Sequence, residues 1–325
     1  MNGPVPETAH ASGIDLWVVG NVLIDLMMKG VPEMPRWGEE VLASGRSEQI
    51  GGQGANLARA AVHLGLSTEL AAVVGDDAPG DRIRATLEAE GIGAHALKTT
   101  TGRTAYAVAA VRPDGERAFI TDLGASASFS VDDLNRHEES MHSSAALALV
   151  GTSNLPGIDL EAAASLLERA RTRGVLTVFD PGWGDEITSG RKLDQILHVI
   201  DVLLPNLDEA RALTGQRDVG ATLRALGDRC PGTVIVTCGE EGSATLDGGT
   251  LVRVEPPPVE VDNAVGAGDV FAAGVISGLL DDRDPVAAMV RGTAAAANYI
   301  SRSEARYEAI GDWRDLESEV KIRRL

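Results

Sequence analysis

The sequence predicts an α/β fold of three layers, in which helices cover both faces of a mostly parallel central sheet. From about residue 145 onward, short apolar strands alternate with helical patterns of roughly ten residues, which is typical of such a sheet. Two earlier β-rich stretches lack this alternation and predict a second, smaller sheet. The 325 residues of the chain are enough for one large domain with this accessory element.

The composition argues against several classes of partner. The net charge is −19 without an extended block of Lys or Arg, whereas nucleic acid or an anionic membrane requires a basic footprint. No apolar run is long enough to span a membrane, and two cysteines are too few for a disulfide framework or a zinc cage. Residues 1–12 are polar and lack the apolar stretch of a signal peptide. We therefore expect a cytoplasmic protein with a disordered start at 1–12 and one domain over 13–325.

In the first part of the chain, local patterns predict five main elements. Helical spacing of Leu57, Ala61 and Leu64 precedes Gly65, which suits the position just after a helix. The predicted elements are strands over 14–19, 41–50 and 71–75 and helices over 56–64 and 80–90.

Two β-rich segments, about 22–50 and 103–121, do not fit the strand–helix alternation. In the second segment, Pro-Asp-Gly at residues 113–115 supplies the turn of a hairpin. We expect these segments to form a small sheet inserted into the main domain, where it covers the functional site.

From residue 145 the alternation is regular, and polar residues follow several strands. The carboxyl ends of parallel strands form the edge at which α/β folds bind ligands. The predicted elements are strands over 147–150, 175–179, 202–204 and 233–237 and helices over 160–173, 192–200, 207–213 and 219–226.

The most informative motif is Gly-Ala-Gly-Asp at residues 266–269, between an extended segment with prolines and a helix of small residues. Small residues at a helix start leave N–H groups uncovered at the positive end of the helix dipole, which is a site for phosphate. A carboxylate at Asp269 makes sense there as a base that takes a proton from a hydroxyl while the N–H groups hold a phosphoryl group. The same residues also suit a glycine-rich turn with an ordinary Asp cap.

A second glycine-rich segment, Gly-Gly-Gln-Gly-Ala-Asn at residues 51–56, ends a strand and opens a helix. Its glycines let a ligand approach the backbone closely, and Asn56 offers a donor and an acceptor to a sugar hydroxyl. The spacing is neither that of a dinucleotide-binding loop nor that of a Walker loop. A tight structural turn is the alternative interpretation.

Three polar strand ends complete the pattern. Asn206 and Glu209 lie on one face of a first helical turn, where they form a capping box or place a carboxylate near water bound to Mg²⁺. Thr237 and the glycines after it suit either a nucleotide phosphate or a hairpin turn. Asp180 is typical of a turn. Together with the two glycine-rich segments, these strand ends describe a phosphoryl-transfer cleft.

These motifs resemble those of the ribokinase-like family of sugar and nucleoside kinases, also called PfkB carbohydrate kinases. The resemblance extends from about Leu16 to about Ile300. The first family signature is matched by Gly51, Gly52, Asn56, Ala58, Gly65 and Gly75. The second signature is matched by Gly266, Ala267, Gly268 and Asp269, followed by Ala273 and Gly274. The family's N-x-x-E motif and nucleotide-phosphate turn are matched by Asn206, Glu209, Thr237, Gly239 and Gly242.

The resemblance implies a Rossmann-like ribokinase fold with a β-sheet lid and an ATP-dependent transfer to a sugar alcohol. Asp269 would be the catalytic base, and Gly266, Ala267 and Gly268 would form the anion hole. The sugar's hydroxyls would be held by Asp25, Gly51, Gly52, Gln53 and Asn56. Mg-ATP would be bound by Asn206, Glu209, Thr237, Gly239 and Gly242, with Glu209 acting on Mg²⁺ through water and Asn298 near the adenine. The lid, formed by about 22–50 and 103–121, mediates homodimerisation in many relatives.

Some positions depart from the family pattern. Relatives usually carry Asp-Thr before the anion hole, whereas this chain has Asn263 and Ala264, with the acidic residue displaced to Asp262. In relatives that stretch supplies ligands to a monovalent cation, so the sequence weakens the expectation of such a site. Leu23 stands where ribokinases carry an Asn for the sugar. Ribose is therefore not the first substrate to expect.

The leading hypothesis is an ATP-dependent kinase acting on a hydroxyl of a monosaccharide or sugar acid. A nucleoside kinase would need an apolar wall near the lid, for which Trp37, Tyr106 and Phe119 are the few aromatic candidates. A hexose-phosphate kinase would need cationic side chains such as Arg117 for the second phosphate. A non-catalytic regulator that binds sugar or nucleotide would not need the carboxylate of Asp269, which disfavours it.

Overall fold

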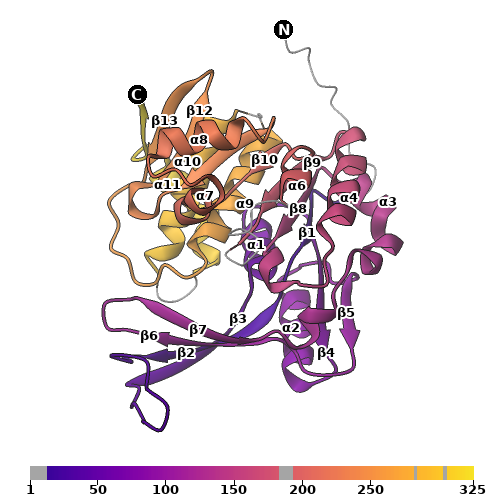
Figure 1. Ribbon diagram of the computed structural model, residues 1–325, viewed down its shortest axis with the longest axis vertical. Coiled ribbons are helices and arrows are strands. Elements are labelled where there is room, and N and C mark those ends of the chain that lie inside the picture. The colour runs from indigo at the N-terminus through magenta and orange to yellow at the C-terminus, as the bar shows by residue number, and fades with distance from the viewer. Residues whose placement is uncertain (1–12, 183–192, 282–283, 303–305) are drawn as a thin grey trace.

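The computed structural model describes residues 13–182, 193–281, 284–302 and 306–325, which form the three-layer α/β arrangement that the sequence predicts (Figure 1). The predicted disordered start at 1–12 lies outside the described residues, as does the first residue of the helix predicted over 192–200. Within the described ranges, no helix combines the length and apolar character that a bilayer crossing requires.

The central sheet has ten strands in the described part of the chain. In order across the sheet, they are β14 (Lys321–Arg324), β13 (Thr250–Glu255), β12 (Ser243–Asp247), β11 (Thr233–Thr237), β10 (Val202–Leu203), β9 (Leu176–Asp180), β8 (Ala146–Val150), β1 (Leu16–Val19), β4 (Thr68–Gly75) and β5 (Leu97–Thr100). All pairings from β11 to β5 are parallel, while β12, β13 and β14 add an antiparallel edge. The predicted mostly parallel sheet is confirmed.

Helices cover both faces of this sheet, because successive side chains of a strand point to opposite faces. In β1, Leu16 and Val18 pack into one core, and Trp17 and Val19 pack into the other. The first core is covered by α1 (Gln53–His63), α2 (Ala78–Ala89), α9 (Ala267–Asp281), α10 (Pro285–Ile300) and α11 (Arg314–Glu317). The second core is covered by α3 (Glu138–His142), α4 (Leu160–Thr172), α6 (Asp194–Leu197), α7 (Leu207–Thr214) and α8 (Val219–Gly227).

The long helices α9 and α10 pack closely, and glycines permit this approach. A Cβ atom on Gly274 would lie 2.5 Å from the Cα of Gly292, and one on Gly278 would lie 2.6 Å from the Cα of Ala288. Most of α9 is buried, which accounts for its small residues. This packing holds α9, which begins at Ala267, against the core from Val270 onward.

The two segments outside the alternation form a separate four-stranded sheet, in the order β3 (Gly45–Gly51), β2 (Leu23–Lys29), β6 (Tyr106–Val111) and β7 (Arg117–Asp122). The β2–β6 pair is parallel, and the two outer pairs are antiparallel. Figure 1 shows this sheet projecting beneath the main domain. One residue, Gly52, joins β3 to α1.

Several boundaries differ from the sequence predictions. Helix α1 begins at Gln53 rather than at residue 56, because Gly52 already accepts the first helical hydrogen bond, from the N–H of Asn56. The strand predicted over 41–50 begins only at Gly45, since Ser44 closes the preceding loop by donating to the carbonyl of Lys29. The sequence patterns did not predict β5, α10 or the antiparallel edge from β12 to β14.

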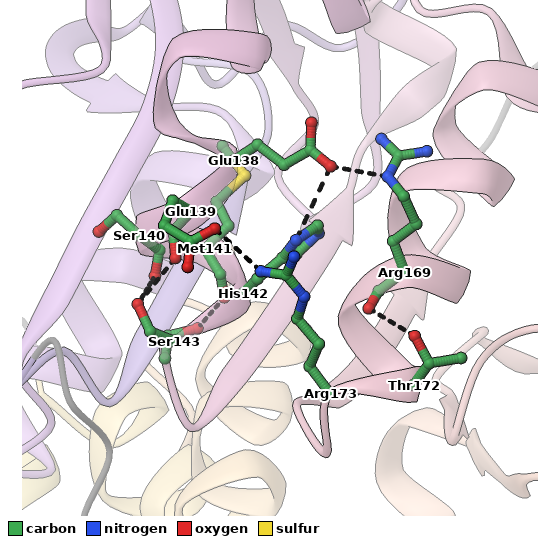
Figure 2. A network of polar contacts seen from close by, with 10 residues as sticks. Glu138, Glu139, Ser140, Met141, His142, Ser143, Arg169, Thr172 and Arg173 are labelled. Atoms are coloured by element: carbon green, nitrogen blue, oxygen red, sulfur yellow. Dashed lines mark hydrogen bonds and ion pairs between the residues drawn. The ribbon is translucent and has the colours of Figure 1, made fainter.

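A polar network joins α3 to α4 (Figure 2). Glu138 accepts a hydrogen bond from Nε of Arg169 at 2.7 Å, and Glu139 accepts one from Nη1 of Arg173 at 3.0 Å. The side chain of His142 is only 1% exposed, and its Nδ1 lies 3.7 Å from Glu138, beyond hydrogen-bond distance. Burial is the largest cause of a lowered pKa for His142, which disfavours the charged form of the ring.

Candidate active site

The start of α9 presents free backbone donors. Gly266 has φ 84°, and a Cβ atom there would lie 2.9 Å from the hydroxyl of Tyr299, so the position requires glycine. The N–H of Ala267 donates within the preceding turn at 3.2 Å, whereas the N–H groups of Gly268 and Asp269 donate to no other group among the described residues. Free N–H groups at the positive end of a helix attract an anion.

A hydrogen bond links the two glycine-rich motifs, which lie 213 residues apart in sequence. Nδ2 of Asn56 donates to Oδ2 of Asp269 at 2.8 Å. The hydroxyl of Tyr307 donates to Oδ1 of Asn56 at 3.1 Å, which fixes the orientation of the amide. The Tyr307 ring is held in turn by the guanidinium of Arg59, whose Cζ lies 4.0 Å from the ring centroid.

The glycine-rich segment at residues 51–56 makes close contacts with β2 and with Asn21, which precedes that strand. A Cβ atom on Gly51 would lie 1.9 Å from a carboxylate oxygen of Asp25, so this glycine makes room for that side chain. Gly52 has φ 95°, and a Cβ there would meet the carbonyl of Asn21 at 2.6 Å. Asp25 is 8% exposed and belongs to the small sheet. These glycines therefore form the tight turn that the sequence allowed, and the same turn brings the backbone close to the carboxylate of Asp25.

Gln53 connects this segment to the end of β9. Its Nε2 lies 3.4 Å from Oδ1 of Asp180, the last residue of that strand. The same carboxylate accepts from the N–H of Gly182 at 3.3 Å, as a turn-forming Asp does. The sequence interpretation of Asp180 as a turn residue is incomplete, because this buried side chain also faces the other site residues. Its place at a strand end was the signal available in the sequence.

Asn206 and Glu209 form the capping box that the sequence allowed. The N–H of Asn206 donates to Glu209 Oε2 and the N–H of Glu209 donates to Asn206 Oδ1, both at 2.9 Å. Asn206 also pairs with Thr237 in an isolated parallel bridge, which places the ends of two strands together. Glu209 is buried at 4% exposure.

A cavity of about 90 Å³ gathers residues from nearly all of these motifs. Its lining comprises Gln53, Asp180, Leu204, Asn206, Glu209, Thr237, Gly268, Asp269, Phe271 and Ala272. Other predicted site residues lie outside this lining. Gly239 has φ 60° with open space around it, whereas Gly242 is fixed by contact with the carbonyl of Val254. Asn298 is buried within α10 at 6% exposure.

Acidic groups accumulate in this cleft, and their pKa values rise. Burial is the largest cause of the rise in the pKa of Asp269 to about 7, opposed by the Asn56 hydrogen bond and reinforced by the charges of Asp25 and Glu209. Burial raises the pKa of Asp25 to about 6. It also raises the pKa of Asp180 well above its usual range, with Glu209 and Asp269 adding to the effect. Burial likewise raises the pKa of Glu209.

This concentration of carboxylates favours a bound cation, and oxygen donors suit Mg²⁺. Within the described ranges, no three Asp, Glu, His or Cys side chains form a ready metal site. The oxygen donors of Asp180, Asn206 and Glu209 in the cavity lining would suit such an ion. The free N–H groups and the base-like Asp269 on the other side of the cavity suit phosphoryl transfer to a hydroxyl.

Comparison with known proteins agrees with this chemistry. The chain matches the model of the pfkB family carbohydrate kinases over residues 14–310. It is 27% identical to the ribokinase of Haemophilus influenzae over 297 residues, which are 90% of this chain and 94% of that protein. It is 32% identical to the fructoselysine 6-kinase of Shigella flexneri over 254 residues, which are 77% of this chain and 89% of that protein.

Among solved structures, the fold is similar to that of Arabidopsis thaliana ribokinase complexed with ribose and ATP. The TM-score is 0.77 at 22% identity, with 92% of this chain and 98% of that chain covered. The predicted ribokinase fold and the predicted family are both confirmed. The chain belongs to the pfkB family of carbohydrate kinases, which are phosphotransferases with an alcohol group as acceptor.

Proposed function

We propose that this kinase transfers the γ-phosphoryl group of ATP to a hydroxyl of a monosaccharide or sugar acid, with Asp269 as the base. The hydrogen bond of 2.8 Å from Asn56 to Asp269 carries the proposal. It joins the motif assigned to the acceptor with the motif assigned to the phosphoryl group. Such a contact serves little purpose in a protein that only binds nucleotide.

In the proposed reaction, the acceptor oxygen attacks the γ-phosphorus and the bond from that phosphorus to the bridging oxygen of ADP breaks. The hydroxyl proton passes to Asp269, whose pKa of about 7 suits a base at neutral pH. The anion hole is assigned to residues 266–268. The free N–H groups of Gly268 and Asp269 would stabilise charge on the transferred group.

The acceptor is assigned to the side of the cleft nearest the small sheet. Asp25, Gly51, Gly52, Gln53 and Asn56 are its proposed ligands. The buried carboxylate of Asp25 suits a hydroxyl donor, because a sugar hydroxyl supplies the hydrogen bond that its burial otherwise denies it. The missing side chain of Gly51 makes room for the carboxylate of Asp25 beside the proposed acceptor site, which is consistent with this role.

Mg-ATP is assigned to the ends of the neighbouring strands. Its proposed ligands are Asn206, Glu209, Thr237, Gly239 and Gly242, with Asn298 near the adenine. Mg²⁺, when bound, would neutralise charge on the ATP phosphates, and Glu209 would hold it through water. The capping box leaves the second oxygen of Glu209 available for that contact.

The small sheet is proposed as a lid. Asp25 and Met27, with their register partners Ala107 and Ala109, form one face and are buried. That face lies toward the acceptor side of the cleft. Closing it would exclude water, so that the phosphoryl group reaches the sugar rather than solvent.

The opposite face of the lid is proposed as the contact of a homodimer. Leu26, Val108 and Ile120 lie in register across three strands, and Ile120 is 63% exposed. An apolar row on an open sheet face is a candidate for burial against a second copy.

The first test is ADP release with Mg-ATP over a panel of pentoses, hexoses, sugar acids, hexose phosphates and nucleosides. Strong turnover with one non-phosphorylated sugar or sugar acid would support the proposal and name its substrate. Turnover only with nucleosides or phosphosugars would contradict the acceptor class and point to the lid arginines and aromatic residues. Binding of ATP without turnover of any acceptor would contradict the proposed activity over the tested classes.

A further inference from the structure

One arginine binds the loop that leads into the start of α9. Nη2 of Arg306 donates to the carbonyl oxygen of Asn263 and to that of Val265, the latter at 3.1 Å. Its Nε lies 3.4 Å from the carbonyl of Tyr299, and its Cζ lies 3.9 Å from the centroid of that ring. In the described part of the chain, all the partners of this guanidinium are carbonyl oxygens and an aromatic face; none is a carboxylate.

Two carbonyl oxygens directed at one nitrogen form an arrangement that positive charge stabilises. Aligned carbonyl dipoles repel each other unless a cation lies between them, and hard monovalent or divalent cations accept such oxygen ligands. A guanidinium supplies the same charge permanently, because it does not lose its proton at physiological pH. The Asn263 side chain also accepts from the N–H of Val265 at 2.9 Å, which holds both carbonyls in place.

The clamped loop reaches directly into the anion hole. Val265 precedes Gly266, whose φ of 84° is compatible only with glycine beside Tyr299. Tyr299 is the same ring that stacks on Arg306. The guanidinium therefore contacts both the loop at 263–265 and the Tyr299 ring, between which lies the turn that exposes the N–H groups of Gly268 and Asp269.

We infer that Arg306 occupies the position of a monovalent cation beside the anion hole, so that this kinase works without one. The inference rests on the proposed phosphoryl transfer. The residues do not fit a separate cation at this loop, because the carbonyls that would hold it are already bound to Arg306. The unusual Asn263-Ala264 sequence at this loop is consistent with that replacement.

The test compares wild type with Arg306→Ala and Arg306→Lys at constant ionic strength, in KCl and in tetramethylammonium chloride. Activity is measured with the acceptor found in the panel, and the melting temperature is measured without substrate. Arg314→Ala is the matched control, because Arg314 also stacks on an aromatic ring, with Cζ 4.5 Å from the ring centroid of Trp313.

Wild type and Arg314→Ala are expected to change less than twofold between the two salts, in rate and without a shift in melting temperature. Arg306→Ala should lose roughly 10- to 100-fold in kcat in tetramethylammonium and recover at least tenfold in KCl, with a higher melting temperature in KCl. Arg306→Lys should retain most activity in either salt.

Activation of wild type by KCl of tenfold or more would overturn the inference. An Arg306→Ala variant that folds but responds to KCl in neither rate nor melting temperature would also overturn it, leaving a purely mechanical clamp. If no acceptor in the panel is phosphorylated, the melting temperatures still decide the cation question separately from the proposed function. If Arg306→Ala does not fold, Arg306→Gln takes its place.

Discussion

Tyr307 and Asp269 bind opposite ends of the Asn56 side chain. The tyrosine hydroxyl donates to the amide oxygen at 3.1 Å, which leaves the amide nitrogen to donate to Asp269 at 2.8 Å. The orientation of one amide thus decides whether the carboxylate receives a hydrogen bond or faces a second acceptor. This short chain of contacts connects the C-terminal segment with both glycine-rich motifs.

Replacement of Asn56 by alanine should move the pH profile of kcat/KM. The Asn56 hydrogen bond lowers the pKa of Asp269, so its loss should raise that pKa above about 7. In the proposed mechanism the ionised carboxylate is the active form, so activity should fall as pH decreases through this value. The midpoint of the acid limb, near 7 in wild type, should move to higher pH by about one pH unit, measured as initial rates from pH 5.5 to 9. Asn135→Ala, a change of an exposed asparagine, should leave the midpoint in place. An unchanged midpoint in Asn56→Ala would refute the role of the bond.

Replacement of Asp269 by asparagine should abolish most turnover while ATP binding is retained. Loss of a general base typically costs about 10²- to 10⁴-fold in rate. Turnover is measured by ADP release and binding by calorimetry, with the exposed Asp312→Asn as the control. Full activity of Asp269→Asn would eliminate Asp269 as the base.

The same variant should be more stable than wild type at alkaline pH. Because the folded-state pKa of Asp269 is raised to about 7, the stability that its protonated form contributes is complete below the unfolded pKa of about 4 and is lost as pH rises from there through about 7. Asparagine avoids that loss. Urea unfolding should therefore show a gain in the free energy of unfolding that is larger at pH 8 than at pH 5 by about 1–3 kcal/mol. An equal gain in the free energy of unfolding at both pH values would show that ionisation of Asp269 does not destabilise the folded state.

Replacement of Ile120 by glutamate should separate the proposed dimer. The variant places a charge in the apolar row of Leu26, Val108 and Ile120, which burial would penalise. Sedimentation velocity at micromolar concentration should show a dimer for wild type and a monomer for Ile120→Glu. Ile322→Glu, at the exposed β14 edge of the main sheet, is the matched control and should remain dimeric. A monomeric wild type would end the lid-dimer proposal.

Replacement of His142 by leucine should flatten the pH dependence of stability at mildly acidic pH. The folded-state pKa of His142 is lowered by burial, with Arg173 and Arg169 also lowering it and Glu138 opposing. The unfolded chain therefore binds a proton first, and the free energy of unfolding of wild type should fall as pH falls below about 6.5. Urea unfolding at pH 7.5 and pH 5 measures the difference, with exposed His198→Leu as the control. The same loss in His142→Leu would assign the effect to other groups.

The parts of the fold that sequence predicted were those governed by local periodicity. The alternation after residue 145 predicted β8, α4, β9 and α7 because each buries its apolar residues with regular spacing. The antiparallel edge was not predicted. β14 is fully exposed and highly charged, and its pairing with β13 depends on chain segments 70 residues apart, which local patterns do not reveal.

The sequence marked the residues that come together at the candidate site where a glycine or a helix start signalled them, as at residues 51–56 and 266–269. Asp180 was underestimated, because its turn geometry is local whereas its approach to Gln53 is set by tertiary packing. Tyr307 and Arg306 carried no recognisable motif at all. Tyr307 contacts Asn56, and Arg306 contacts Asn263 and Val265, all more than 40 positions away, and only folding brings these residues near.

A single residue stands between the last strand of the small sheet and the helix that carries Asn56. Gly52 holds φ at 95°, with its neighbours packed against Asn21. Any rotation of β3 relative to α1 must therefore change the backbone torsions of Gly52. Asn56, whose amide donates to Asp269, lies in the first turn of the same helix. Under the proposed mechanism, a movement of the small sheet that encloses the acceptor would therefore also shift Asn56 and change the pKa of Asp269.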